Sequence, residues 1–292
     1  MRHVRCMLLG LFAACFACVD ARAQWSSLTV GTADAVVDEY GSMLKGVVEA
    51  AETCGHTFAP SELVFILRTA NGVIDVPGTN GMPTNSNNEI IFTTGIGKGI
   101  DVCLGQTGQF GASIPKYPVG QIFARVFNRD ALPSASFYAD SQVFNVNPNF
   151  PDPFIAHIDQ TSNPLDPSDP DGDGLNNSWE KSVGSNGADP DTDGDGVSDG
   201  NEFRAGTGIT NALSYLALVQ LFPQSAGDLM VQWDSVDGKD YQLQFTANDL
   251  ASTNVVFTNI NGVVSATGPL ASTIVTNGLS FPIGHFRVLL VE

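Results

Sequence analysis

The sequence predicts a mainly β protein, in which two antiparallel β-sandwich-like domains are joined by an irregular segment. Two observations predict the sandwiches. Residues 25–150 and 227–292 contain short runs rich in Val, Ile, Phe and Thr, which favour strands, and turn residues separate these runs. A third observation predicts the irregular segment, because a stretch rich in Pro and Asp lies between the two regions.

The first 23 residues have the pattern of a signal peptide. Two arginines precede an apolar run over 6–19, and the small residues Ala21 and Ala23 mark a cleavage site before Gln24. A run of 14 apolar residues is too short to span a bilayer as a helix, which disfavours a retained anchor. A lipoprotein signal with Cys15 as the lipidated residue is the alternative. We therefore expect a secreted or cell-surface protein, cleaved near Ala23.

The charge of the mature chain excludes several classes of partner. Residues 1–23 hold three arginines and one aspartate, so cleavage leaves 13 − 3 = 10 basic and 31 − 1 = 30 acidic residues, a net charge of −20. Nucleic acid and anionic membrane surfaces would both be repelled. No further segment is long and apolar enough to span a membrane, so no transmembrane segment is expected in the mature chain.

Two cysteines, Cys54 and Cys103, remain after cleavage. In an exported protein two cysteines most often pair, and this disulfide would close a loop of about 50 residues, worth on the order of 4 kcal/mol in the chain-entropy model. Two buried free thiols are the alternative. Metal binding by these residues is disfavoured, because neither a CxxC motif nor a neighbouring histidine pair accompanies them.

The N-terminal β domain is predicted over 24–150. β-branched and aromatic residues dominate its clearest strand candidates, which are 61–69, 88–95, 120–128 and 141–146.

One segment of this domain, 34–51, fits two structures. Its apolar residues follow a helical period, but Gly41 and Gly46 would each cost a helix about 1 kcal/mol relative to Ala. The same letters fit a β-hairpin, which we favour because the surrounding sequence has β character.

A Pro-rich linker and two acidic repeats are predicted over 151–207, followed by a small C-terminal β domain over 208–292. Short runs of β character at regular spacing indicate a second, smaller sandwich. These runs are 228–236, 239–247, 254–260, 272–278 and 285–292.

Two acidic stretches, 169–180 and 191–202, share one spacing at an offset of 22 residues. Ca²⁺ takes six to eight oxygens, and a twelve-residue loop can supply them from side chains at positions 1, 3, 5, 9 and 12 and a carbonyl at 7, with Gly at 6. Only one register meets all these requirements in each stretch. The predicted ligands are Asp169, Asp171, Asp173, the Leu175 carbonyl, Asn177 and Glu180, and then Asp191, Asp193, Asp195, the Val197 carbonyl, Asp199 and Glu202.

About two Ca²⁺ ions are therefore expected, which makes the joining segment an irregular calcium-binding repeat segment. A solvated acidic linker is the alternative, but such a linker needs neither Gly at position 6 nor an acid at position 12 in both copies. Mg²⁺ is disfavoured because it keeps water ligands and is rarely held by an all-protein cage.

The two loops differ from the regulatory helix–loop–helix hand. Asn176 and Ser198 occupy position 8, where that family has a branched apolar residue, and the upstream sequences NPLDPS and NGADP disfavour helices. Over 164–207 the pattern DxDxDGxxDxxE, with an Asp-Pro shortly before it, resembles the bacterial thrombospondin type 3 repeat. The resemblance implies repeats that wrap around calcium ions with little other core. Asn177 departs from the Asp usual at position 9, so the first site should bind calcium more weakly than the second.

The flanking regions carry a looser resemblance. The N-terminal sequences VVDEYGSMLKG and LVFILRTANGVIDVPG, and the C-terminal VQWDSVDGKDYQLQFTANDL, are similar to β domains of secreted bacterial proteins that contain such repeats. Those domains are known by their arrangement rather than by an activity. The resemblance implies an exported, modular, surface-associated protein.

No catalytic motif is evident, so we expect a protein that is not an enzyme. The histidines of the mature chain lie in no zinc pattern, and there is no GxSxG elbow. The acidic pair Asp38 and Glu39 is expected in an exposed turn.

The sequence thus favours a secreted or cell-surface structural or interaction protein, in which Ca²⁺ stiffens a spacer between two β domains. Its partner would be an unknown protein or polysaccharide at the cell surface. The alternative is a carbohydrate-binding or adhesive module in which Trp233 and Tyr241 stack on a sugar, although both residues also fit a sandwich core. A hydrolase with a cleft in the N-terminal domain is a third hypothesis.

Overall fold

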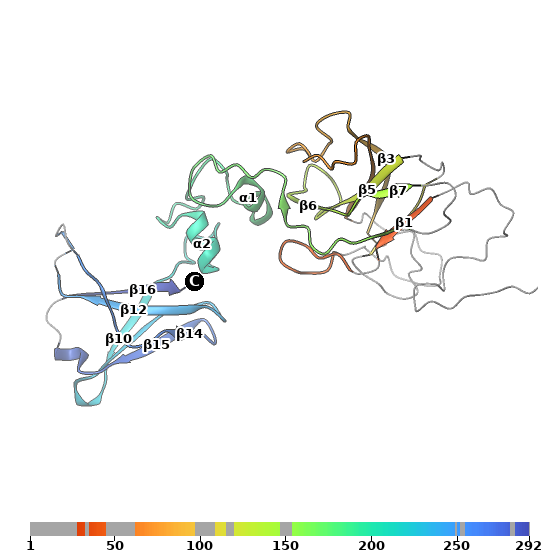
Figure 1. Cartoon of the computed structure of the whole chain (residues 1–292). Coiled ribbons are helices and arrows are strands. Elements are labelled where there is room, and N and C mark those ends of the chain that lie inside the picture. The colour runs from red at the N-terminus through yellow and green to blue at the C-terminus, as the bar shows by residue number, and fades with distance from the viewer. Residues whose placement is uncertain are drawn as a thin grey trace, which may run out of the picture. The chain divides into compact units, whose positions relative to one another are not determined.

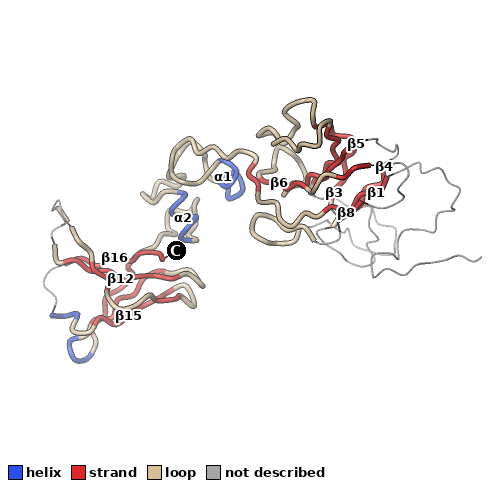
Figure 2. Tube along the Cα trace, in the orientation of Figure 1, coloured by secondary structure: helices blue, strands red, loops and turns tan. Residues whose placement is uncertain are grey.

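The structure is a computed structural model, and its fold is shown in Figures 1 and 2. The chain divides into two compact units, Met1–Pro167 and Ser168–Glu292. The predicted signal peptide, Cys15, Cys54 and Cys103 lie outside the described residues, so cleavage, lipidation and the disulfide stay predictions. The described residues are 28–32, 35–44, 62–96, 109–114, 120–146, 154–248, 250–251, 255–280 and 284–291.

The protein is mainly β, as predicted. In the first unit, β2, β3 and β5 form where the sequence predicts them, and β7 covers half of the candidate 141–146. The strands of this unit are β1 Leu28–Thr32, β2 Leu63–Thr69, β3 Asn88–Gly95, β4 Gly111–Ile114, β5 Gly120–Phe127, β6 Phe137–Asp140, β7 Phe144–Val146, β8 Phe154–Ala156 and β9 Asn163–Pro164.

The described residues of the first unit form two sheets. One has the order β3-β2-β5-β6-β9, with β7 also paired to β5, and the other has the order β4-β1-β8. Among the described strands of this unit, the pairs are antiparallel with one exception, the parallel pair β1–β8, in which Val30 lies opposite Phe154. These strands are far apart in the sequence, so no tight hairpin dictates their direction. β8 and β9 lie in the Pro-rich stretch after residue 150.

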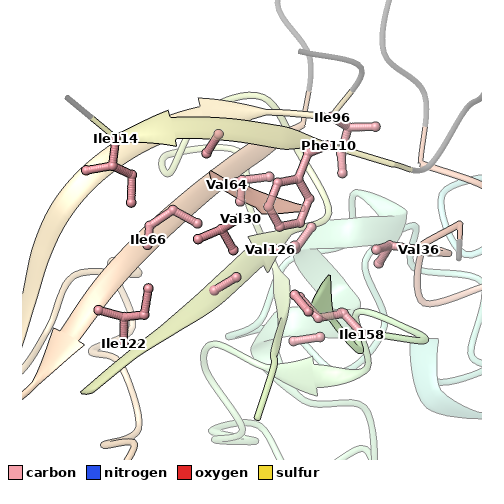
Figure 3. Packing of buried hydrophobic residues seen from close by; sticks show 14 of the residues in the cluster. Val30, Val36, Val64, Ile66, Ile96, Phe110, Ile114, Ile122, Val126 and Ile158 are labelled. Carbon is pink, nitrogen blue, oxygen red and sulfur yellow. The ribbon is translucent and has the colours of Figure 1, made fainter. Parts of the chain in front are cut away.

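Both faces of the larger sheet are covered. Val64 and Ile66 of β2 and Val126 of β5 point into a cluster with Val30 of β1, as Figure 3 shows. The residues between them along these strands, among them Phe65, point to the opposite face of the sheet and pack into a second cluster. A strand buried on both faces is apolar along its whole length, which accounts for the run LVFIL in β2.

The segment that fitted either a helix or a hairpin forms a tight turn over its described part, 35–44. Val37 pairs with Met43 in an antiparallel bridge, and the Asp38 carboxylate accepts hydrogen bonds from the backbone N–H groups of Tyr40 and Ser42. This arrangement is that of a hairpin rather than a helix. Residues 45–51 lie outside the described part of the chain.

Glu39, in this turn, is buried rather than exposed, so the expectation of an exposed acidic pair was wrong for it. Its side chain is 0% exposed. Asn128 Nδ2 donates to Glu39 Oε2 over 2.9 Å, and Arg129 Nη2 lies 3.3 Å from Oε1. These partners at the end of β5 offset the cost of burying the charge.

In its described residues, the second unit contains two short α-helices followed by two antiparallel sheets. The sheets have the orders β10-β11-β15 and β13-β12-β14, with β16 also paired to β12. No helix in the described part of the protein is long and apolar enough to cross a membrane. The elements are α1 Asn177–Val183, α2 Asp199–Ala205, β10 Leu218–Pro223, η2 Ser225–Gly227, β11 Leu229–Asp234, β12 Asp240–Thr246, β13 Thr258–Asn259, β14 Val264–Ser265, β15 Leu270–Val275, η3 Gly278–Ser280 and β16 His285–Val291.

Trp233 and Tyr241 form the centre of the second core. They are 0% and 1% exposed, and their rings pack edge to face with centroids 6.3 Å apart. Val231 on β11 and Leu243 on β12 each lie two residues away from them, on the same face of the strand, and belong to the same cluster. Side chains this deeply buried cannot stack on a sugar, so the hypothesis that these two residues bind carbohydrate was wrong.

Candidate metal centre

Each acidic loop leads directly into a short helix. In the first repeat, Asn176 Oδ1 accepts hydrogen bonds from the backbone N–H groups of Ser178 and Trp179, which fixes the start of α1. Both helices end at a glycine with left-handed φ, Gly184 and Gly206. Because each helix begins inside its loop, the acid at position 12 lies in the first helical turn and can face the loop aspartates.

The first aspartate of each loop folds the loop backbone around itself. Asp169 accepts from the N–H groups of Gly172 and Gly174 over 2.9 and 3.1 Å. Asp191 accepts from Gly194 and Gly196 in the same way, over 3.0 and 2.9 Å. The two loops therefore have one conformation.

Glycine at position 6 is required by the backbone. The φ angles of Gly174 and Gly196 are 94° and 93°, a region that residues with a Cβ rarely adopt.

The aspartates at positions 1, 3 and 5 converge in both loops. One carboxylate oxygen from each of Asp169, Asp171 and Asp173 lies within 4.8 Å of the others, and the same holds for the second loop. At position 5, Oδ1 accepts from the backbone N–H two residues later, over 2.7 Å for Asp173 and 2.8 Å for Asp195. Three like charges this close repel one another unless a cation lies between them.

Glu180 and Glu202, at position 12, are almost completely buried. Their exposed fractions are 1% and 0%. Burial, together with the charges of the neighbouring aspartates, raises the pKa of both carboxyl groups from 4.5 to about 7. Thr207 Oγ1 donates to Glu202 Oε1 over 3.1 Å and opposes this shift in part.

Several of these carboxylate oxygens are buried and accept no hydrogen bond. Burying a charged oxygen without a donor costs free energy, and a divalent cation between such oxygens would remove that cost. Because every candidate metal ligand is a hard oxygen atom, this set of ligands suits Ca²⁺ rather than a softer transition metal. The unpartnered oxygens are Asp171 Oδ2, Glu180 Oε1 and Oε2, Asp193 Oδ2, Asp195 Oδ2 and Glu202 Oε2.

Position 9 differs between the two repeats. Asp199 is fully buried, and its two oxygens accept from the backbone N–H and the hydroxyl of Thr192 over 2.8 and 2.6 Å. Its charge raises the pKa of both Glu180 and Glu202, so it acts on both loops. In the first repeat, Asn177 Nδ2 donates to Ser168 Oγ over 3.0 Å.

Contacts between the repeats were not predicted from the sequence. The backbone N–H of Gly200, in α2, donates to Asp173 Oδ2 of the first loop. The rings of Trp179 and Phe203 lie 4.9 Å apart and join α1 to α2. An aromatic residue beside each position-12 glutamate is the one sequence signal for this contact. Direct contacts therefore link the two loops, which are not independent sites.

Tandem acidic loops of one conformation, each ending in a buried glutamate, define a class of repeat suited to hard cations. The family model of the bacterial TSP3 repeat matches residues 169–190 and 191–207. This segment therefore consists of two bacterial TSP3 repeats, as the sequence predicted, and TSP3 repeats are calcium-binding. No curated protein and no solved structure matches the chain.

Proposed function

We propose that the two repeats bind about two Ca²⁺ ions and that the bound ions stiffen a spacer between two β domains. The observation that carries this proposal is the set of buried carboxylate oxygens without hydrogen-bond donors in the two loops. The ions would supply the positive charge that these oxygens lack.

The proposed ligands follow the repeat pattern. The carboxylates at positions 1, 3, 5 and 12, the residue at position 9 and the carbonyls of Leu175 and Val197 would surround each ion. At position 9, Asp199 would bind through oxygens that Thr192 already orients. Asn177 offers a neutral oxygen in its place, which supports a weaker first site.

The proposed location is outside the cell, as a secreted or cell-surface protein. Proteins with TSP3 repeats are usually extracellular, and extracellular calcium modules work at dissociation constants of about 0.1–1 mM. The TSP3 repeat is a structural module, so we propose a structural or interaction role without catalysis. The proposed partner is a protein or polysaccharide at the cell surface. Nucleic acid is disfavoured as a partner, because the strong negative charge of the chain would repel its phosphates.

Isothermal titration calorimetry of the mature chain with CaCl₂ tests the proposal. We expect about two ions per chain with dissociation constants of about 0.1–1 mM. At about 10 mM Ca²⁺, each filled site should then stabilise the fold by about 1.4–2.7 kcal/mol. The variants D171N and D193N should each weaken the site that loses its ligand more than they weaken the other site. The proposal fails if no binding is seen up to about 10 mM.

Calcium affinity should depend on pH near neutrality. Glu180 and Glu202 can bind the ion only when their carboxyl groups are ionised. Because the pKa of both groups is about 7, protons compete with the ion below that pH. Affinity should fall by up to about tenfold per pH unit below 7 at each site. Calorimetry at pH 8.0 and 6.0 in buffers of different ionisation enthalpy measures both affinity and proton release. Equal affinities without proton release would contradict the prediction.

The stability of the metal-free chain should have the opposite pH dependence. The folded-state pKa of both glutamates is raised above the unfolded value, so the folded state binds more protons between pH 4.5 and about 7. The destabilisation from these two buried charges is therefore full above pH 7 and is relieved as the pH falls through 7 towards 4.5.

A further inference from the structure

The residue at position 17 of each repeat follows the glycine that ends the helix. It is Ser185 in the first repeat and Thr207 in the second. Its backbone N–H donates to the carbonyl of the position-12 glutamate, over 3.0 Å in the first repeat and 3.1 Å in the second. This motif folds the chain back along the end of the helix, so the side chain at position 17 can reach the side chain of the glutamate.

In the second repeat, the side chain at position 17 bonds to the glutamate. Thr207 Oγ1 donates to Glu202 Oε1 over 3.1 Å. Glu202 is completely buried, and its other oxygen, Oε2, has no hydrogen-bond partner among the described residues. Because threonine is β-branched, few rotamers are open to it, and the direction of its hydroxyl is restricted. The hydroxyl therefore holds one oxygen of the carboxylate and leaves the other oxygen for a cation.

In the first repeat, the corresponding hydroxyl does not hold the glutamate. Ser185 Oγ is buried and has no partner in the described part of the chain, and the same is true of both carboxylate oxygens of Glu180. The backbone of Gly187 covers this glutamate instead. A Cβ at this glycine would overlap both Glu180 Oε2 and Asn177 Oδ1. Close backbone packing thus confines the glutamate of the first repeat, whereas a hydrogen bond confines that of the second.

We propose that Thr207 is a positioning residue for the second calcium site, where its hydroxyl holds the Glu202 carboxylate in the orientation that binds the ion. This inference rests on the proposed calcium binding and adds a residue that would not itself contact the ion. A side chain that is already held loses less conformational freedom when it binds a metal. Removing an outer partner of a metal ligand typically lowers metal affinity by about 10- to 100-fold.

The variants T207V and T207S separate the hydroxyl from the rest of the side chain. Valine keeps the branched shape but cannot donate, whereas serine keeps the hydroxyl. In the D171N background, which weakens the first site, T207V should lower the remaining calcium affinity by about tenfold. T207S should stay within about threefold of that background, because it loses only the restricted rotation of the β-branched side chain.

The matched control is S185A, which removes the hydroxyl at the same position of the first repeat. It is measured in the D193N background, which weakens the second site. This hydroxyl has no partner among the described residues, so its removal breaks no hydrogen bond. The affinity of the first site should therefore change by less than about twofold.

Calorimetry of the full mature chain with CaCl₂ up to about 50 mM covers dissociation constants of about 0.1–10 mM. Thermal unfolding in EDTA shows whether each variant is folded. The inference is overturned if T207V binds calcium as tightly as its D171N background, if T207S binds as weakly as T207V, or if S185A weakens the first site as much as T207V weakens the second. A wild-type chain that binds no calcium would instead refute the proposed function, and this inference with it.

Discussion

Replacing Glu202 with Gln is expected to lower the calcium affinity of the second repeat by at least about 100-fold. Glu202 is fully buried beside the aspartates of its loop, and position 12 is the one expected to bind the ion through both oxygens. Gln keeps the shape of the side chain but can offer only one neutral oxygen. E180Q should have the same effect on the first repeat.

The same substitution should stabilise the metal-free protein at pH 8. Without an ion, burial of the Glu202 carboxylate and, to a smaller extent, the negative charges near it raise its pKa to about 7. Removing that charge relieves a destabilisation of at most about 3 kcal/mol, the free-energy equivalent of the raised pKa. E202Q is therefore expected to have opposite effects with and without calcium.

Urea denaturation at pH 8, in EDTA and in about 10 mM Ca²⁺, measures both effects. E89Q is the matched control, because Glu89 pairs with Arg68 on the surface and its side chain is 57% exposed. This control should change stability by less than about 0.5 kcal/mol in either condition. Destabilisation by E202Q in EDTA would mean that Glu202 holds the fold together without any ion.

The conformation of each loop is predictable from sequence because it is local. Within twelve residues, the spacing of the aspartates and the position of Gly174 and Gly196 determine which oxygens can converge. The strands β2, β3 and β5 are predictable for a similar reason, because each is a short run rich in β-branched and aromatic residues between turn residues.

Contacts between elements were not predictable, because no local rule places them. The bond from Gly200 to Asp173 and the packing of Trp179 on Phe203 depend on how one repeat lies on the next. The parallel pairing of β1 with β8 likewise depends on the packing of the whole first unit.

Burial is the second property that sequence patterns leave open. Alternation along β11 and β12 shows that Trp233 and Tyr241 share faces with other apolar residues, but not that these faces point inwards. Glu39 is the opposite case, because an acidic residue in a turn, which the sequence places at the surface, is buried where Asn128 donates a hydrogen bond to it.

Removing calcium is expected to make the repeat segment sensitive to trypsin while both β cores remain folded. Residues 166–202 contain eleven acidic residues and one basic residue, a net charge of −10. Two ions would supply four positive charges, and among the described residues this segment contributes none to the three buried hydrophobic clusters. The β cores are built from apolar side chains and contain none of the proposed ligands.

The sequence makes trypsin a specific probe of this segment. Between Arg129 and Lys239, the only Lys or Arg residues are Lys181 in α1 and Arg204 in α2. Cleavage there requires each helix to open locally, so its rate reports the population of the open state. In EDTA we expect cleavage at Lys181 and Arg204 to be at least about tenfold faster, equivalent to a loss of about 1.4 kcal/mol.

The double variant D171N/D193N separates loss of the ions from any effect of EDTA on the protease. At constant calcium it should be cleaved at Lys181 and Arg204 as fast as the metal-free wild type, since each loop has lost a ligand. Mass spectrometry of the early fragments identifies the cleavage sites. If chelation leaves the rate unchanged, or if the first cuts fall at Arg68 or Arg287 in the β domains, the ions do not stiffen this spacer.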